Sequence, residues 1–274
     1  MPGRVNNCWG MDMKEPLPGR EERTATEGLT MVLDKGLGTE SLRDMLEIAG
    51  DYMDFLKLSF GTSFLYPEDI LDKKIELAEE AGIDIYPGGT LFEIAVFRSR
   101  MKEYLFRVKK LGFSAIEISS GTMEIGPKVK NDAIRKAKSL GLKVLTEVGK
   151  KSRRETLVSD EFIERITRDE QAGADYIIVE GRESGRGISI YDREGSIKLQ
   201  KFSRIADKLK ECRKKIIWEA PLKKQQVFFI RNLGQSVNLG NIAPEEVVAL
   251  EALRRGLRGD TFRDCLNKQQ GEIV

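Results

Sequence analysis

Short apolar runs recur along the chain and predict buried β-strands at residues 30–33, 55–60, 83–86, 115–119, 143–146, 176–180, 216–219 and 236–239. Stretches with the i, i+3, i+4 spacing of amphipathic helices separate these runs. They cover residues 41–49, 67–81, 101–111, 128–140, 159–172, 197–211, 225–232 and 244–255, with a further helix around Glu93. A glycine often stands between a helix and the next apolar run, which is typical of strands in a parallel sheet.

The repetition of strand and helix predicts an α/β fold. Eight such units in 274 residues indicate a closed (β/α)₈ TIM barrel with a single domain. An open, doubly wound sheet is the alternative, but no Gly-x-Gly-x-x-Gly fingerprint follows the first predicted strand. No Walker A sequence is present either.

We assign residues 28–263 to the barrel. Residues 1–27 contain Pro2, Pro16 and Pro18 and no hydrophobic periodicity, so they predict a loosely ordered arm. Residues 264–274 are left as a C-terminal tail.

Four consecutive predicted strands end on or near a glutamate, namely Glu117, Glu147, Glu180 and Glu219. The carboxyl ends of barrel strands share one rim, so these carboxylates should converge there. Burying unpaired carboxylates is costly, and such a cluster therefore needs lysine, arginine or a metal ion. Oxygen ligands favour a hard cation such as Mg²⁺. Because Mg²⁺ typically takes one or two protein carboxylates, the four are candidate metal ligands without all being needed.

Charge and composition narrow the classes of function. The chain has 46 basic and 44 acidic residues, a net charge of +2 with no basic stripe, which argues against nucleic-acid binding. No apolar run approaches the ~18 residues that span a bilayer, so no membrane association is expected. Three widely spaced cysteines fit a reducing cytoplasm. The sequence has no histidine, which excludes histidine-activated nucleophiles and leaves acid–base work to Lys, Glu, Asp, Tyr or Cys.

Candidate catalytic residues follow from the same placement at strand ends. Asp34 and Lys35 follow the first strand, Lys57 lies within the second, and Lys150 and Lys151 follow the fifth. Burial would lower the pKa of Lys57 and nearby glutamates would raise it, so the sequence leaves the sign of the shift open.

Several segments are candidates for binding an anionic substrate. Gly88, Gly89 and Thr90 precede a helix and offer backbone N–H groups to a phosphate. The loop after the eighth strand also opens a helix and contains Asn241. Further candidates at predicted strand ends are Ser119, Arg182 and Asn238.

Many of these segments resemble the phosphosulfolactate synthase family. The resemblance covers residues 28–263 and rests on Asp-Lys-Gly-Leu at 34–37, Gly-Thr-Ser at 61–63, Tyr-Pro-Gly-Gly-Thr-Leu-Phe-Glu at 86–93, Glu-Val-Gly-Lys-Lys at 147–151, Glu-Gly-Arg-Glu-Ser-Gly at 180–185, Glu-Ala-Pro at 219–221, Val-Asn-Leu-Gly-Asn-Ile at 237–242 and Leu-Arg-Arg-Gly-Leu-Arg-Gly-Asp-Thr at 253–261.

The resemblance implies a (β/α)₈ barrel fold. It also implies a carbon–sulfur lyase that uses Mg²⁺ to add sulfite to phosphoenolpyruvate. The product would be (2R)-phospho-3-sulfolactate, on a route to coenzyme M or sulfolactate. It also implies a homo-oligomer, a trimer, and a lysine of residues 149–151 as the acid that protonates C2. Whether Lys150 or Lys151 is that acid stays open at this point.

Two other functions remain as alternatives. The first is another barrel enzyme that transforms phosphoenolpyruvate or a sugar phosphate. The second is a non-catalytic relative similar to plant heat-stress-associated proteins.

Overall fold

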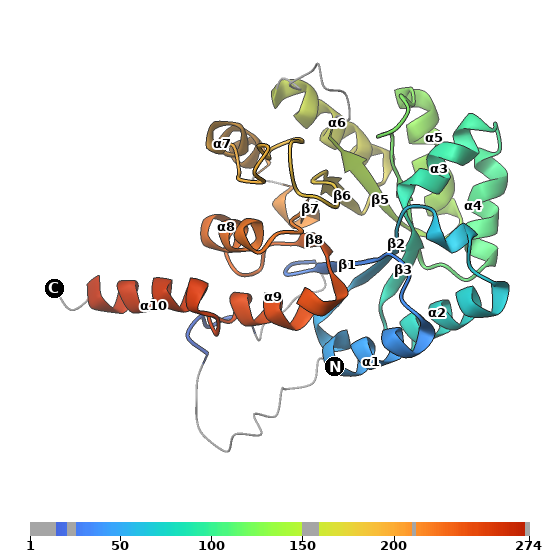
Figure 1. The fold of residues 1–274 in the computed structure, drawn as a ribbon. Coiled ribbons are helices and arrows are strands. Elements are labelled where there is room, and N and C mark those ends of the chain that lie inside the picture. The colour runs from blue at the N-terminus through green and yellow to red at the C-terminus, as the bar shows by residue number, and fades with distance from the viewer. Residues whose placement is uncertain (1–14, 21–25, 150–158, 210–211, 272–274) are drawn as a thin grey trace.

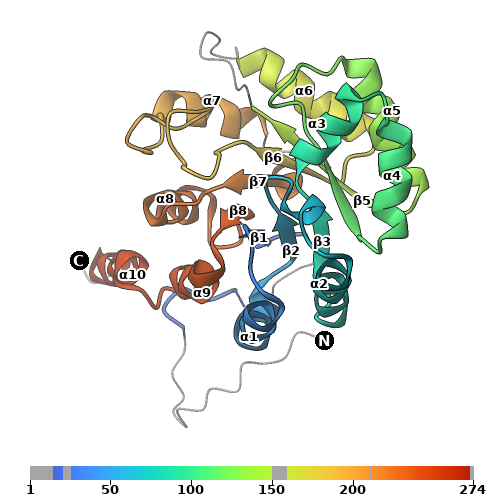
Figure 2. The ribbon, with the colours of Figure 1, turned by 45° about the vertical axis from the view of Figure 1, so that its right-hand side comes forward.

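Eight parallel strands form a nearly closed barrel, and helices surround it on the outside (Figures 1 and 2). The structure is a computed structural model that describes residues 15–20, 26–149, 159–209 and 212–271. The predicted TIM-barrel fold is therefore confirmed, and the open doubly wound alternative is wrong.

The strands are β1 (Thr30–Asp34), β2 (Phe55–Leu58), β3 (Asp84–Pro87), β4 (Ala115–Ile118), β5 (Lys143–Val148), β6 (Tyr176–Val179), β7 (Ile216–Glu219) and β8 (Leu239–Ile242). The helices are α1 (Thr39–Ala49), α2 (Glu68–Glu80), α3 (Gly89–Phe97), α4 (Met101–Lys110), α5 (Pro127–Ser139), α6 (Ser159–Ala172), α7 (Leu199–Lys208), α8 (Lys223–Leu233), α9 (Val247–Arg254) and α10 (Gly259–Gly271).

The strands are hydrogen-bonded in the order β3-β2-β1-β8-β7-β6-β5-β4, so β1 pairs with β8. The seam of the barrel lies between β3 and β4, where side chains replace the ladder bonds. The Ile85 N–H donates to Ser114 Oγ at 3.0 Å, and the Lys143 ammonium pairs with the Asp84 carboxylate. The first contact joins β3 to the residue that precedes β4, and the second joins β3 to β5, the neighbour of β4; both lie at the amino end of the seam.

Alternation along the strands divides the barrel interior into an apolar and a polar layer. Phe55 on β2, Ala115 on β4 and Ile217 on β7 belong to an apolar cluster inside the barrel. Two residues later on the same strands come Lys57, Glu117 and Glu219, which face the same way because side-chain direction repeats every second residue. The polar layer therefore lies toward the carboxyl ends of the strands, where barrel enzymes carry their active sites.

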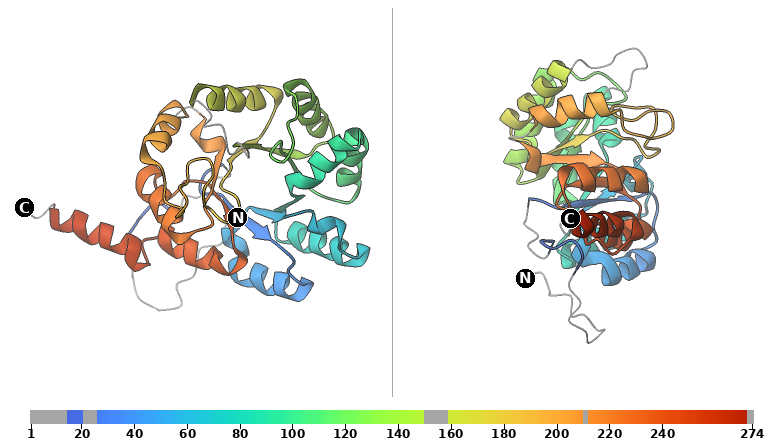
Figure 3. Two further views of the ribbon diagram at one scale, coloured as in Figure 1. Left: turned by 45° about the horizontal axis from the view of Figure 1, so that its top comes forward. Right: turned by 90° about the vertical axis from the view of Figure 1, so that its left-hand side faces the viewer.

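Two elements differ from the sequence-based prediction. The eighth strand begins at Leu239, not at residue 236. Its residues include Gly240 and Asn241, and because glycine and asparagine are rare in strands, the sequence pattern did not predict this segment. Helix α10 was not predicted. It projects beyond the ring of helices (Figures 1 and 3), and its Asp264 pairs with Arg231 on α8.

The described residues of the N-terminal arm, 15–20, contact helix α9. The Arg20 guanidinium is 1% exposed and pairs with Glu251 at 2.9 Å, and the Leu17 N–H donates to the Arg255 carbonyl at 3.2 Å. Among the helices that the structure describes, none is long and apolar enough to cross a membrane.

Candidate active site

A cavity of about 450 Å³ opens at the carboxyl ends of the strands. It brings together most of the residues predicted for the site, from seven different strands and the loops that follow them. These residues are Lys57, Gly88, Gly89, Thr90, Glu117, Ser119, Glu147, Glu180, Arg182, Glu219 and Asn241.

Lys57 is the buried cation of this cavity. Its Nζ lies 2.9 Å from Glu117 Oε2 and 3.4 Å from Glu219 Oε1, with only 10% of the side chain exposed. Desolvation lowers the pKa of Lys57, but the attraction of the surrounding glutamates outweighs it and holds the pKa well above its usual value. The net shift of the Lys57 pKa, whose direction the sequence left open, is therefore upward, and Lys57 carries a proton at neutral pH.

Glu219 is buried at the end of β7 but has well-placed donors. Its Oε2 accepts hydrogen bonds from the backbone N–H groups of Gly181 at 2.8 Å and Arg182 at 3.0 Å. Together with Lys57 on Oε1, these donors compensate for the loss of water around the carboxylate. The same two bonds fix the start of the loop after β6, which carries Arg182 to the rim of the cavity.

Glu147, at the end of β5, lies among other carboxylates. The Ser119 hydroxyl donates to Glu147 Oε1 at 3.1 Å. Burial is the largest cause that raises the pKa of Glu147 well above its usual value; repulsion from Glu180, Glu117 and Glu219 adds to it, and Lys57 opposes it. The cavity therefore has more negative charge than Lys57 balances, and it favours a further cation.

Gly88 and Gly89 bring the start of α3 against β4. The Gly89 N–H donates to Glu117 Oε1 at 3.2 Å. A Cβ atom at Gly89 would lie 2.3 Å from Ser119 Cβ and 2.6 Å from Glu117 Oε1, so only glycine fits. The Gly89 amide is thus used by a glutamate, while Thr90 is exposed at the mouth.

Glu93 on α3 positions a loop beside the site, a role that the sequence analysis did not assign. It is 4% exposed, and its Oε1 accepts hydrogen bonds from the backbone N–H groups of Thr122 at 2.8 Å and of Gly121. It holds the β4–α5 loop beside the cavity, on the mouth side of the seam. The available signal was a charged residue in the apolar run Leu91–Phe97, which predicts a buried carboxylate with a specific partner.

Three predicted residues lie differently from the expectation. Asp34 points away from the cavity: its Oδ2 pairs with Lys74 at 2.5 Å, and both side chains are fully buried. Its Oδ1 accepts from the N–H groups of Gly36 and Leu37 at 2.7 and 2.8 Å, so Asp34 shapes the loop after β1. Lys35 lies on the exposed rim and pairs with Glu183 at 2.7 Å.

Asn238 is not brought to the mouth. It precedes β8, at the amino end of the barrel, where its Oδ1 accepts from the Leu29 N–H at 2.9 Å and its Nδ2 donates to the Lys214 carbonyl at 2.8 Å. The three-residue error in the predicted strand is the cause. Lys150 and Lys151 lie outside the described residues.

Three of the non-glycine residues with positive φ line the cavity: Phe60 at 56°, Arg182 at 57° and Asn241 at 55°. Such backbone conformations are disfavoured for L-residues and collect at functional sites.

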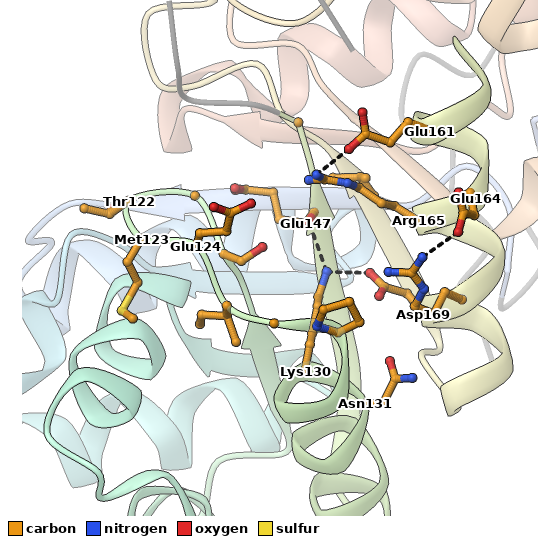
Figure 4. A pocket seen from close by; sticks show the side chains of 18 residues that line it. Thr122, Met123, Glu124, Lys130, Asn131, Glu147, Glu161, Glu164, Arg165 and Asp169 are labelled. Carbon is orange, nitrogen blue, oxygen red and sulfur yellow. Dashed lines mark hydrogen bonds and ion pairs between the residues drawn. The ribbon is translucent and has the colours of Figure 1, made fainter. Parts of the chain in front are cut away.

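A second, larger cavity of about 620 Å³ adjoins the first one and shares Thr122 and Glu147 with it (Figure 4). It lies between α5 and α6. Its cations are each engaged by a carboxylate: Lys130 by Asp169 at 2.6 Å, and Arg165 and Arg168 by glutamates one turn away on α6. We place the candidate active site in the smaller cavity, because it opens at the carboxyl ends of the strands and its buried glutamates, Glu117, Glu180 and Glu219, outnumber Lys57.

Comparison with known proteins identifies the family of the chain. The family model described as (2R)-phospho-3-sulfolactate synthase matches residues 18–260. The chain is 49% identical to phosphosulfolactate synthase of Methanocaldococcus jannaschii over 237 residues, which is 86% of this chain and 94% of that one. It is 46% identical to the synthase of Methanothermobacter thermautotrophicus, over 89% of this chain and 95% of that one.

Among solved structures, 3-hexulose-6-phosphate synthase superimposes with a TM-score of 0.52 at 10% identity, over 82% of this chain and 98% of that one. This likeness concerns the barrel fold alone. The sequence matches extend over nearly the whole barrel and include every strand end of the cavity. The chain belongs to the (2R)-phospho-3-sulfolactate synthase family.

Proposed function

We propose that this protein adds sulfite to phosphoenolpyruvate to give (2R)-phospho-3-sulfolactate, as a carbon–sulfur lyase on a route to coenzyme M or sulfolactate. The observation that carries the proposal is the buried Lys57 ammonium, set between Glu117 and Glu219 in a cavity that opens at the carboxyl ends of the strands.

The cavity suits a small, highly charged substrate. Its volume of about 450 Å³ is in the usual range for small-molecule sites. Arg182 lies on its exposed rim, where a guanidinium can reach a phosphate, and Thr90 opens helix α3, whose N-terminus attracts anions. We assign the phosphate of phosphoenolpyruvate to this rim and its carboxylate to the floor near Lys57.

Mg²⁺ fits the charge balance of the site. No group of three or more aspartate, glutamate, cysteine or histidine side chains in the described ranges is arranged to hold a metal ion. Mg²⁺ commonly binds through only one or two carboxylates together with waters and substrate oxygens, so a full protein cage is not required. Glu147 and Glu180 would hold it, because both line the cavity and their carboxylates repel each other there; the Arg182 guanidinium also lies 3.7 Å from Glu180. The ion would supply positive charge to the substrate oxygens.

The reaction needs no base to activate its nucleophile, which agrees with the absence of histidine. The sulfur lone pair of sulfite attacks C3 of phosphoenolpyruvate and forms the C–S bond. The electron pair of the C2–C3 double bond moves to C2 and into the carboxylate, which becomes an aci-carboxylate dianion. The Lys57 ammonium, whose side chain is only 10% exposed, stabilises this charge as it develops.

The second step is protonation of C2. The raised pKa of Lys57 makes it a weak acid, so it serves better as a fixed positive charge than as the proton donor. We assign the donor to Lys150 or Lys151, directly after the strand that carries Glu147. A donor on one face of the intermediate would give a single stereoisomer, and changing it to alanine should lower kcat by about 10²–10⁴-fold.

We also propose that the protein works in the cytoplasm as a homo-oligomer, a trimer by family resemblance. Large apolar side chains are exposed on the loop after β2 and on α3, namely Phe60, Phe64, Leu65 and Phe97. The two segments lie together, since a Cβ atom at Gly61 would be 3.4 Å from Leu91. Subunit contacts commonly cover such a surface. Sedimentation velocity should give a mass above that of the 30.9 kDa chain, and a monomer would contradict this.

The proposal is tested by incubating the protein with phosphoenolpyruvate and sulfite and following the phosphorus NMR spectrum. A new phosphate ester should form only when sulfite is present. EDTA should stop the reaction, and added Mg²⁺ should restore it. Conversion with another nucleophile but not with sulfite would favour a different phosphoenolpyruvate-transforming enzyme, and no conversion of any kind would favour a non-catalytic relative.

A further inference from the structure

Strand β8 contains a β-bulge at the carboxyl end of the barrel. Thr30 of β1 pairs with Leu239, and Val32 pairs with Ile242. Two steps along β1 therefore correspond to three steps along β8. The extra residue lies between the two pairs, at Gly240 and Asn241. Bulges of this kind redirect side chains and occur often beside active sites.

The bulge changes the face to which Asn241 points. Leu239 and Ile242 both pack in the outer core, between the strands and the helices. Gly240 faces inward, because a Cβ atom there would lie 2.4 Å from Met31 Cε and 3.0 Å from Ile217 Cγ2. Regular alternation would then turn Asn241 outward and Ile242 inward. With the bulge, Asn241 lines the cavity instead.

The backbone and the burial of Asn241 point to a ligand. Its φ of 55° is in the left-handed region, which asparagine tolerates better than most residues but which glycine would occupy without strain. The residue is 5% exposed, and its buried Oδ1 has no hydrogen-bond partner within the described ranges. Rotation of the amide by 180° would present the NH₂ group at the same place. A buried polar group without a protein partner is expected to have another one.

We propose that Asn241 is a catalytic residue whose side-chain amide donates a hydrogen bond to the carboxylate of the three-carbon substrate as that group gains negative charge. This inference rests on the proposed function and adds a hydrogen-bond donor to the proposed substrate site.

The position of Asn241 favours the carboxylate over the phosphate. Gly240 is the register partner of Glu219, so Asn241 lies one residue beyond the carboxylate that faces Lys57. Arg182 and Thr90, in contrast, are exposed at the rim. A neutral amide also adds a donor beside Glu219 without adding charge.

The test compares Asn241→Gly with Asn241→Asp. The glycine variant keeps the backbone conformation and removes the amide, and the aspartate variant keeps the shape and removes the donor. Ser99→Gly is the matched control, because Ser99 also has a positive φ of 56° but is exposed between α3 and α4. Circular dichroism and thermal melting establish that each variant folds.

Both Asn241 variants should lower kcat by about 10²–10³-fold, the loss typical of a missing oxyanion donor. Oxalate, a planar dianion that resembles the aci-carboxylate, should bind the folded glycine variant at least about tenfold more weakly in calorimetry, whereas inorganic phosphate should bind as before. Ser99→Gly should change none of these values.

Two results would overturn the inference. One is a folded Asn241→Gly protein with wild-type kcat and oxalate affinity. The other is a raised KM for phosphoenolpyruvate and weaker phosphate binding at unchanged kcat, which would assign the amide to the phosphate. If the wild-type protein does not convert phosphoenolpyruvate and sulfite, the proposed function fails, and the comparison of oxalate affinities still decides whether Asn241 binds a carboxylate.

Discussion

Replacing Lys57 with methionine tests the electrostatic core of the site. The change keeps the length of the side chain and removes its charge. Lys57 Nζ is 2.9 Å from one carboxylate oxygen and 3.4 Å from another, and its side chain is 10% exposed. The variant would leave Glu117 and Glu219 facing each other without the ammonium between them.

The magnitude follows from these distances. Coulomb's law with an effective dielectric constant of about 20 gives roughly 5 kcal/mol for each contact before the cost of desolvation. Removing one partner of a buried ion pair typically costs about 3–5 kcal/mol of net stability. At roughly 2–4 °C per kcal/mol for large domains, Tm should fall by about 10 °C. Activity should be lost as well, because the developing negative charge would meet two carboxylates.

Urea denaturation of the wild type and Lys57→Met at pH 7.5 measures the difference in the free energy of unfolding. The matched control is Lys138→Met. Its ammonium is 2.7 Å from Asp175, but the lysine side chain is 39% exposed, so the expected loss is about 0–1 kcal/mol. A loss of stability in Lys57→Met no larger than that in Lys138→Met would show that the buried ion pairs of Lys57 do not stabilise the site.

Two further predictions concern the carboxylate ring. Gly89→Ala should lower kcat/KM by at least about tenfold and destabilise the fold by about 1–3 kcal/mol, because the new methyl group would overlap Ser119 and Glu117; wild-type kinetics would contradict the close packing. Because the pKa of Glu147 is raised in the folded state, the folded protein keeps a proton that the unfolded chain loses above about pH 4.5. The free energy of unfolding should therefore fall as the pH rises from about 4.5 toward the raised pKa of Glu147. Thermal melts in metal-free buffer should show this slope in the wild type and a weaker one in Glu147→Gln, and equal slopes would count against it.

The sequence predicted the polar rim because two rules combine there. Side chains repeat their direction every second residue, and the carboxyl ends of barrel strands share one rim. Lys57, Glu117 and Glu219 are therefore placed by strand assignment alone. Gly89 was predicted to offer its N–H group to a phosphate, but in the structure this group donates to Glu117 at 3.2 Å, and the close approach of α3 to β4 requires the glycine.

The remaining features depend on contacts that no local pattern reveals. Asp34 follows a strand like the other candidates, but its partner Lys74 is 40 residues away on α2 and holds it outside the cavity. Asn238 lies at the amino end of the barrel because β8 begins only at Leu239, and Asn241 lines the cavity because of the bulge in β8. A bulge is set by the pairing of two strands, so the sequence of one strand does not predict it.

A crystal structure of the protein with phosphoenolpyruvate and Mg²⁺ would locate the active site. We expect the substrate in the cavity of about 450 Å³, with its carboxylate near Lys57 and Asn241 and its phosphate near Arg182. Substrate bound instead in the neighbouring cavity, beside Lys130 and Arg165, would contradict the placement of the active site.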